Sequence, residues 1–262
     1  MSPRAEGAGG ETARSPYEGV LQILRYNWPW YGLAVVLCAA AVTFSRVAHP
    51  SAAVAAPLLS AAGLAAFWSL ASLWVSHLVY DRSRIADGTW IDQALPAPPS
   101  SIATFHAGLD ETSARLSEKF PSARLAVFDF YDPASMTEPS IRRARRTSRA
   151  VSASIPIDVR RIPLSDRTQS AAFVVFAAHE LRDSDERILF FREIRRVLRF
   201  EGDLLVVEHV RDGWNLLAFG PGALHFLPRG AWLRAFRDAG LELVGAFRVT
   251  PFVTVFRLRP AP

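Results

Sequence analysis

Residues 173–212 read FVVFAAHELRDSDERILFFREIRRVLRFEGDLLVVEHVRD, and this stretch decides the fold class. Residues 173–178 form a short continuous apolar run, typical of a strand that is buried on both faces. Residues 204–207 form a second such strand, and the segment between them has apolar residues at helical spacing. A strand, a helix and a second strand almost always make a right-handed parallel crossover. The sequence therefore predicts an α/β fold.

The helix inside this stretch has predictable ends. Ser184 is expected to cap its amino end, because a serine side chain can accept a hydrogen bond from the first turn. Asp185 and Glu186 follow in that turn, where the helix dipole favours acidic groups. Gly202 is expected to end the helix in a left-handed conformation.

Polar side chains follow both predicted strands. His179 and Glu180 come after the first strand, and Glu208 and His209 come after the second. The carboxyl ends of parallel strands meet at one edge of a sheet, and open α/β sheets bind their ligands at that edge. We therefore expect these four residues to lie beside a binding site.

The composition limits the classes of protein that need to be considered. The chain has 262 residues, of which 50% are hydrophobic, and its mean hydropathy of +0.13 is high for a purely soluble protein. The net charge is +5, but the arginines are mixed with acids, which does not favour nucleic-acid binding. Cys38 is the single cysteine, which excludes an internal disulfide and a cysteine zinc cluster. No zinc-type spacing is present either, so no metal site is expected.

Two long stretches near the amino terminus lack charged residues. Residues 1–25 are expected to be a disordered tail. Residues 26–45 and 47–80 contain no Asp, Glu, Lys or Arg, and a membrane-spanning helix needs about 20 apolar residues. Residues 26–80 are therefore predicted to form a transmembrane helical hairpin. A buried helical pair in a soluble protein is the alternative.

Flanking residues predict how the hairpin is oriented. Trp28, Trp30 and Trp74 lie near the outer ends of the two helices, as interfacial aromatic residues do. The outer ends are flanked by several arginines, whereas the loop between the helices has only Arg46. The positive-inside rule then predicts a two-helix, multi-pass protein of the cell membrane, with both termini and the catalytic domain in the cytoplasm.

The remainder of the chain is predicted to be a linker (81–101) and a second domain (102–262). The linker is polar and then Pro-rich. A third strand is expected at residues 155–159, and residues 213–230 are expected to form a long loop or lid. Residues 241–249 and 252–258 are joined by a connection so short that the two strands must be antiparallel.

An arginine-rich helix is expected at residues 140–148. It carries Arg142, Arg143, Arg145 and Arg146. These side chains would bind anionic lipid headgroups at the cytoplasmic surface, each contributing about 1 kcal/mol, or would form a solvated helix face.

Several local patterns point to one family. Strands are also expected at residues 102–105 and 125–128, and Asp129 closes the second of these. Asp158 lies near the end of the strand expected at 155–159 and is followed by Ile162, Pro163 and Asp166. Residues 191–198 read FREIRRVL and precede Glu201 and Gly202, and residues 231–241 read AWLRAFRDAGL. Together with the order of elements, these patterns make residues 102–259 resemble a class I S-adenosylmethionine-dependent methyltransferase.

The resemblance implies a fold and a cofactor. The fold would be Rossmann-like, a mostly parallel seven-stranded sheet with an antiparallel last strand, here preceded by two transmembrane helices. The cofactor would be S-adenosylmethionine, with Asp129 at its ribose and Asp158 beside its adenine. Gly108, Asp110 and Ala177 complete the expected cofactor-binding residues. Asp110 would face the positive charges of the cofactor, or would serve only as a helix cap.

The first loop departs from the family pattern. The family has an acid followed by three spaced glycines, whereas residues 105–113 read FHAGLDETS and retain only Gly108. Glycines in such a loop let the backbone approach the cofactor. The cofactor is therefore expected to bind differently, weakly or not at all.

Three histidines are the candidate catalytic residues. His179 and His209 follow parallel strands, and His225 lies in a glycine-containing segment that could close over a substrate. A general base assists methyl transfer when the acceptor is a hydroxyl group. The alternative is that these residues fix the loops by hydrogen bonding.

Two functions are compatible with these observations. The first is a membrane-anchored methyltransferase that acts on a hydrophobic small molecule or lipid acceptor, with the lipid bilayer as its other partner. The second is a methyltransferase-like domain that has lost catalysis and serves as a membrane-tethered binding or assembly module. A different Rossmann-like nucleotide enzyme is disfavoured by the terminal antiparallel strands.

Overall fold

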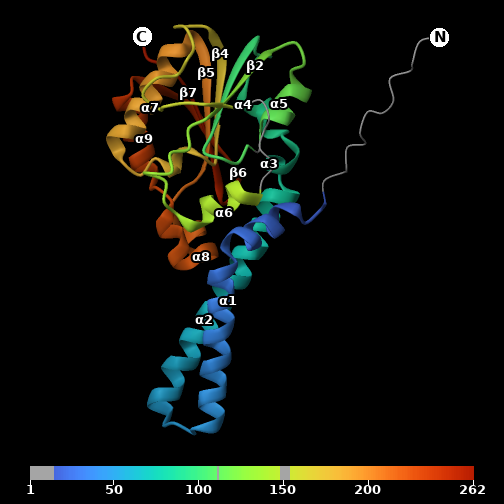
Figure 1. The fold of residues 1–262 in the computed structure, drawn as a ribbon, viewed down its shortest axis with the longest axis vertical. Helices are drawn as coiled ribbons and strands as arrows, with labels where there is room; N and C mark the ends of the chain where they lie inside the picture. Colours follow the sequence, from blue (N-terminus) through green and yellow to red (C-terminus); the bar gives the residue numbers. More distant parts are fainter. Residues whose placement is uncertain (1–14, 111, 148–153) are drawn as a thin grey trace, which may run out of the picture.

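One mixed sheet forms the centre of the molecule. The computed structural model describes residues 15–110, 112–147 and 154–262, and within them seven strands pair in the order β3-β2-β1-β4-β5-β7-β6 (Figure 1). All pairs among the first five strands in this order are parallel, and β7 runs antiparallel to both β5 and β6. The predicted mostly parallel sheet with an antiparallel last strand is thus confirmed. The strands are β1 (Ser101–His106), β2 (Arg124–Asp129), β3 (Ile155–Pro156), β4 (Gln169–Val175), β5 (Leu198–His209), β6 (Leu241–Thr250) and β7 (Val253–Pro260).

Helices cover both faces of this sheet. One face packs against α7 and α9 through buried residues such as Phe190 and Trp232. The other face packs against the end of α2, the short helices that follow it, α5 and α8. The helical elements are α1 (Glu18–Val47), α2 (Ala52–His77), the π-helix η1 (Leu78–Arg82), α3 (Arg84–Asp87), α4 (Trp90–Ala94), α5 (Ser113–Lys119), α6 (Pro139–Thr147), the 3-10 helix η2 (Ala178–Glu180), α7 (Ser184–Val197), α8 (Gly213–Phe219), the 3-10 helix η3 (Gly220–His225) and α9 (Arg229–Asp238).

Several predicted strand boundaries were wrong. β4 begins and ends earlier than residues 173–178, because Gln169 already pairs with Leu198 of β5. β5 is longer than the predicted 204–207 and includes Gly202, whose φ is not positive. Gly202 does not end the preceding helix; it is needed because a Cβ there would lie 3.0 Å from the backbone oxygens of Arg199 and Gln169. β3 contains two residues, so Asp158 lies beyond the strand that was expected to end with it.

Two helical predictions also need correction. Asp183, and not Ser184, caps α7: its side chain accepts hydrogen bonds from the backbone N–H groups of Asp185 and Glu186. The expected loop at 213–230 is largely helical, since it forms α8 and η3 and the start of α9. Asp212 caps α8, since its side chain accepts from the N–H of Asn215 at 3.0 Å. The glycines of the segment favoured the loop prediction, although this aspartate is a typical helix cap.

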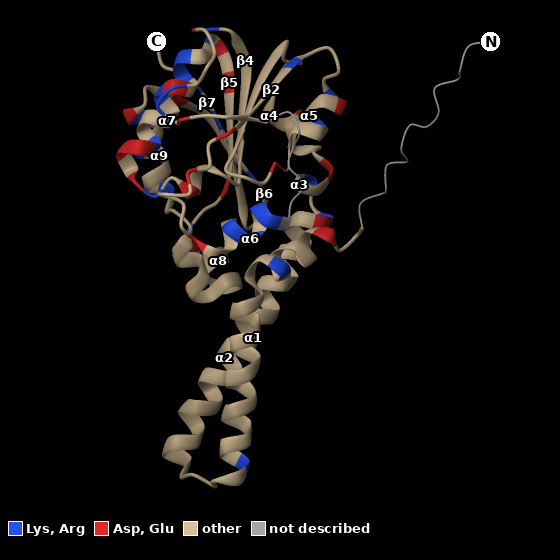
Figure 2. Cartoon of the chain, viewed as in Figure 1, with Lys and Arg blue, Asp and Glu red and all other residues tan. Residues whose placement is uncertain are grey.

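The helical hairpin projects away from the α/β domain (Figure 1). The helical segments Glu18–Val47 and Ala52–Asp87 are each long and apolar enough to cross a membrane, and little of their most apolar part is buried within the protein. Figure 2 shows the hairpin almost free of charged residues, in contrast to the domain. α1 begins at Glu18, so the expected disordered tail at residues 1–25 extends too far; residues 1–14 lie outside the described part.

The hairpin root, which comprises the start of α1, the end of α2 and η1, packs against the domain. The Asp81 carboxylate, just after α2, accepts hydrogen bonds from the N–H groups of Gly19 and Val20 and so closes the start of α1. The segment predicted as a linker, 81–101, is not a free connection. Its helices α3 and α4 bury Trp90 and Ile91 to 2% and 1% exposure against the sheet. These two aromatic and aliphatic side chains therefore belong to the domain core.

The carboxyl edge of the parallel strands faces the hairpin root. His209, at the end of β5, lies 3.0 Å from the Tyr80 hydroxyl of η1. Arg143 of α6 donates to the backbone oxygen of Tyr26 in α1. Gly220 lies against the indole of Trp68 in α2, where an added Cβ would overlap the ring. These contacts, visible as the closeness of α6 and α8 to the hairpin in Figure 1, place the expected ligand edge beside the apolar helices.

Candidate functional site

The end of the edge over β1 and β2 is occupied by an arginine. Asp129 ends β2, and its Oδ2 accepts a hydrogen bond of 2.7 Å from the Arg145 guanidinium of α6. The same guanidinium lies 4.1 Å from the centre of the Tyr131 ring. Gly108 follows β1 with a φ of 108°, and the Arg145 side chain fills the space that a Cβ there would need. Arg145 thus covers both residues that the family resemblance assigned to the cofactor at this end.

His106, the last residue of β1, organises the loop beneath this arginine. Its Nδ1 accepts from the N–H of Gly108 at 3.0 Å, and its Nε2 lies 2.8 Å from the Ser154 hydroxyl. Burial lowers the pKa of His106, although the nearby charge of Asp129 opposes that effect. A neutral imidazole is therefore favoured, consistent with Nδ1 acting as an acceptor.

The other expected cofactor residues are more scattered. Asp110 accepts from the N–H groups of Thr112 and Ser113, which supports its role in starting α5. Its neighbour Glu111 lies outside the described residues. Asp158 is exposed in a turn, where it accepts from the N–H of Arg160 at 2.8 Å. Ala177 is buried to 2% exposure just after β4.

An open cavity of about 350 Å³ lies next to this loop. Leu109 and Asp110 of the loop, Val175 at the end of β4 and Tyr80 of η1 contribute to its wall. Its described lining also reaches Glu18 and Gln22 of α1. The cavity is at the lower end of the range of about 300–1,000 Å³ that is usual for small-molecule sites.

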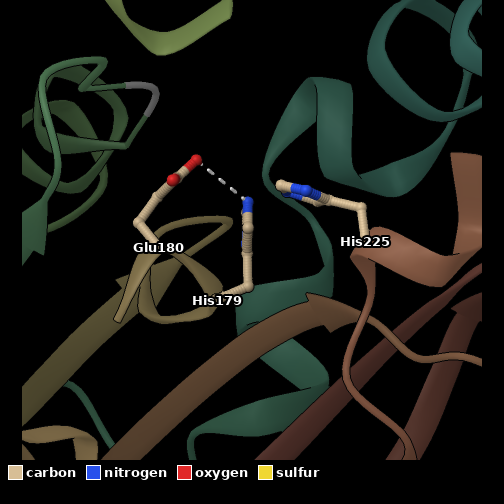
Figure 3. A group of neighbouring side chains, drawn as sticks. All are labelled: His179, Glu180 and His225. Atoms are coloured by element: carbon tan, nitrogen blue, oxygen red, sulfur yellow. Dashed lines mark ion pairs between the residues drawn. The ribbon is translucent and has the colours of Figure 1, made fainter. Parts of the chain in front are cut away.

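The end of the edge over β4 and β5 holds a cluster of imidazoles and carboxylates (Figure 3). The His179 Nδ1–H donates to Glu208 Oε2 at 2.8 Å, and its backbone N–H donates to Glu208 Oε1 at 3.2 Å. Its Nε2 lies 3.4 Å from Glu180 Oε1, and its ring meets that of His225 edge to face at 5.3 Å. η2 positions His179 and Glu180, β5 positions Glu208, and η3 positions His225.

The carboxylates determine the charge of His179. Burial alone would lower its pKa, but the charge of the 1%-exposed Glu208 and hydrogen bonds with both carboxylates outweigh it and raise the pKa to about 10. Burial likewise raises the pKa of Glu180, but interaction with His179 gives a net decrease. The protonated form of His179 is therefore favoured at neutral pH in this arrangement.

His225 contacts a second ion pair at the rim of the cluster. Its Nδ1 lies 3.1 Å from Glu138 Oε1, and the Arg182 guanidinium lies between these two residues. The hydrogen bond with His225 lowers the pKa of Glu138. The Arg182 and Glu138 side chains are each 38% exposed, so this pair forms the solvent side of the cluster.

His209 lies on the opposite face of the sheet from Glu208. Its Nδ1–H donates to the backbone oxygen of Phe252 at 3.0 Å, and its Nε2 accepts from the Tyr80 hydroxyl. Phe176 and Phe226 stack on its two faces. Burial lowers its pKa to about 4. In this structure His209 is a neutral core residue that joins β5 to the hairpin root, and both ring nitrogens are engaged.

The sequence predicted some of the residues that meet at this edge and did not predict others. His179, Glu180 and His225 meet as a group. The predicted third catalytic residue, His209, does not belong to that group, although the Phe226 ring contacts both His209 and His225. Arg145, Glu138 and Arg182 were not expected at either end of the edge. They come from segments whose distance from the strands in sequence gives no local signal, and only an arginine-rich helix near the second strand pointed to Arg145.

Comparisons with known proteins agree on the fold. No protein-family model and no curated protein matches the chain. Among solved structures, a methyltransferase from Aquifex aeolicus described as S-adenosylmethionine-dependent aligns with a TM-score of 0.52 and 16% identity, over 71% of this chain and 93% of that one. The mitomycin 7-O-methyltransferase MmcR aligns with a TM-score of 0.54 and 15% identity, over 95% of this chain and 74% of that one. This chain has the class I methyltransferase fold.

The methyltransferase fold permits a test of the implied cofactor against this chain. A left-handed glycine after β1 and a carboxylate at the end of β2 are suited to a close-lying nucleoside with ribose hydroxyls, and a cavity adjoins the loop. The space between them is filled by a flexible, half-buried arginine side chain and not by backbone. The residues therefore fit S-adenosylmethionine, provided that Arg145 leaves Asp129.

Proposed function

We propose that this chain is a membrane-anchored, S-adenosylmethionine-dependent methyltransferase whose acceptor is hydrophobic or membrane-associated. The observation that carries the proposal is the position of the carboxyl edge of the sheet, which lies against the root of an exposed apolar hairpin. In open α/β sheets this edge binds the ligands.

Gly108 and Asp129 would hold the cofactor. The Asp129 carboxylate would accept from the ribose hydroxyls, and the loop at Gly108 would lie close to the bound molecule. When bound, S-adenosylmethionine supplies a methyl group on a positively charged sulfur. The chain's own contribution is positioning: loop, cavity wall and hairpin root hold the acceptor in line and keep water out, which is the main requirement for this type of transfer.

Membrane anchoring by residues 26–80 follows from the exposed apolar side chains of the hairpin. Trp30, Val35 and Leu70 are 67%, 69% and 70% exposed, a costly arrangement in water. The methyltransferase-like domain is proposed at 102–262, with the helices of 81–101 packed against it. Figure 2 shows basic residues on α6, which lies beside the hairpin, and Arg143 of α6 donates to the backbone of Tyr26 in α1. These observations support a cytoplasmic membrane surface rich in anionic lipid.

An apolar surface on α8 and η3 supports a membrane-dissolved acceptor. Trp214, Leu217 and Leu224 are 55%, 57% and 61% exposed, and they lie on the elements that pack against α2. At the bilayer interface these side chains would contact lipid. η3 also carries His225, so one short segment links the lipid phase to the cluster over β4 and β5.

The proposal is tested with the full chain in lipid nanodiscs. We expect S-adenosylhomocysteine to bind, as measured by calorimetry. D129N should weaken binding at least tenfold, because an amide replaces the charged carboxylate and leaves one neutral acceptor oxygen for the two ribose hydroxyls. Labelled methyl from the cofactor should enter the lipid extract of a membrane that contains the wild-type chain. Full retention of affinity in D129N, or the absence of any cofactor binding by folded protein, would refute the proposal.

The second candidate function is a membrane-tethered binding module without catalysis. The pairing of Arg145 with Asp129 favours it, because a permanent ion pair there replaces the cofactor. R145A distinguishes the two functions: a module that has lost its cofactor site gains no affinity for S-adenosylhomocysteine when the arginine is removed.

A further inference from the structure

The cluster over β4 and β5 has the donor set of a metal site. His179, Glu180 and His225 each offer one ligand atom, and these atoms lie within 4.8 Å of one another (Figure 3). Two imidazoles and one carboxylate form a ligand set that first-row transition metals favour and that leaves other coordination positions open. We propose that His179, Glu180 and His225 bind one divalent transition-metal ion.

Distances within the cluster suit such an ion. Metal–nitrogen and metal–oxygen bonds of about 2.0–2.2 Å place neighbouring ligand atoms roughly 3.0–3.5 Å apart. The His179 Nε2 and Glu180 Oε1 atoms are already 3.4 Å apart. His225 approaches from the other side on η3, an element with glycines at 220 and 222, so a small movement of its ring closes the third position.

Glu208 supplies the support that metal-binding histidines usually have. It accepts the Nδ1–H of His179 at 2.8 Å and so leaves Nε2 as the atom that faces Glu180 and His225. A carboxylate behind the histidine fixes the ring and increases its basicity. Because Glu208 is 1% exposed and also accepts the His179 backbone N–H, this orientation is built into the sheet.

The surrounding charges favour an added cation. Glu138, Glu180 and Glu208 surround the two imidazoles, and Arg182 is the arginine that pairs with this group at the rim. The Arg182 guanidinium lies 2.5 Å and 2.6 Å from the two ring nitrogens of His225. Binding of the ion requires Arg182 to release His225. Arg182 would then still pair with Glu138, whose Oε1 lies 3.1 Å from the guanidinium.

The ion specifies an acceptor class, an inference that rests on the proposed methyltransferase function. Its remaining coordination positions would be open to an acceptor, because the Glu138 and Arg182 side chains on the solvent side of the cluster are each 38% exposed. A divalent ion there coordinates an oxygen and lowers the pKa of an attached hydroxyl group. An acceptor with a hydroxyl or carbonyl oxygen is therefore favoured. Coordination by His179 Nε2 requires this nitrogen to be unprotonated, so binding of the ion would release its proton to the solvent.

Metal titration of the tag-free full chain in nanodiscs tests the site directly. After treatment with a chelator, the chain is titrated with Zn²⁺ by calorimetry and with Co²⁺ by visible absorption. We expect one ion per chain and a Co²⁺ spectrum typical of mixed nitrogen and oxygen ligands. H179Q, E180Q and H225N should each weaken binding at least a hundredfold, whereas E242Q and H49N should bind as the wild type does.

H179Q is chosen to preserve the fold, since a glutamine amide can still donate a hydrogen bond to Glu208. Unfolding midpoints identify any variant that has lost its fold. Absence of the ion in folded wild-type chain, or unchanged binding in folded E180Q and H225N, would overturn the metal site. S-adenosylhomocysteine binding is measured in the same samples. If the ion binds and the cofactor does not, the methyltransferase function fails while the metal site stands.

Discussion

The two ends of the carboxyl edge solve the same electrostatic problem in different ways. Over β1 and β2, Asp129 is neutralised by Arg145, a side chain from a separate helix that is 33% exposed. Over β4 and β5, Glu208 is neutralised by His179, which donates two hydrogen bonds to it. A ligand could displace the Arg145 side chain from Asp129, whereas the His179–Glu208 pair is part of the fold. We therefore expect a ligand to bind first at the β1–β2 end.

The largest expected effect is at Glu208. E208A removes a buried carboxylate and leaves the His179 Nδ1–H and backbone N–H without an acceptor. Removing one partner of a buried pair costs about 3 kcal/mol or more. Chemical unfolding of the full chain in detergent measures this loss, with the exposed E242Q as control. A change below about 0.5 kcal/mol, the range of ordinary surface substitutions, would show that the pair is not structural.

Arg145 is expected to have the next largest effect, with the opposite sign for ligand binding. R145A removes an ion pair and a cation–π contact that the cofactor has to displace, together about 1–2 kcal/mol. S-adenosylhomocysteine should bind roughly 5- to 30-fold more tightly. R142A changes an exposed arginine on the same helix and should leave the affinity unchanged. Weaker binding by R145A would mean that the arginine contacts the cofactor.

Gly108 and Arg145 should be coupled. G108A places a Cβ both at a φ of 108° and within the Arg145 side chain. Backbone strain of this kind costs about 1–3 kcal/mol. In the R145A background the overlap is removed but the strain is not, so part of the cost should disappear. A double-mutant cycle of unfolding free energies measures the coupling, which is expected to be about 1 kcal/mol. Strictly additive effects would mean that the Arg145 side chain does not contact Gly108.

A further expected effect depends on pH and concerns His209, at the end of β5. Burial lowers the pKa of His209 to about 4, so between the unfolded value near 6.5 and pH 4 the unfolded chain binds more protons. The stability contributed by neutral His209 is present above pH 6.5 and is lost as the pH falls toward 4. Tyr80, Asp212 and His179 are the titratable groups that face or influence it.

H209Q supplies the comparison for this pH dependence. Glutamine keeps hydrogen-bonding capacity but does not titrate, so the acid sensitivity of H209Q between pH 6.5 and 4 should be smaller than that of the wild type. Unfolding midpoints across that interval provide the measurement. Parallel curves for the two chains would contradict a neutral, buried His209.

Much of the fold was predictable because it depends on local patterns. The apolar run at 173–178 and the periodic helix after it led to β4, α7 and β5, and the short connection before Phe252 required the antiparallel pair β6–β7. Their boundaries were less predictable. Gln169 and Gly202 belong to strands because of their neighbours in space, which neither residue's intrinsic preference indicates.

The candidate site was predictable only in part for the same reason. Strand ends placed His179 and Glu208 at the ligand edge, and alternation along β5 explains why His209, one residue later, faces the other side. The position of Arg145 depends on how α6 packs against α1, and that of Arg182 on its pairing with Glu138. Such contacts between distant segments have no signature in the order of residues.

The packing of the hairpin root has a practical and a geometrical consequence. Val75 of α2 and Val79 of η1 are 6% and 0% exposed within the same apolar cluster as the strands. A truncated chain without the hairpin would lack part of its own interior, so a soluble fragment that starts after residue 80 should express poorly. If the hairpin anchors the chain in a bilayer as proposed, the height of the two candidate sites above the lipid would be set by this packing and not by the length of a flexible tether.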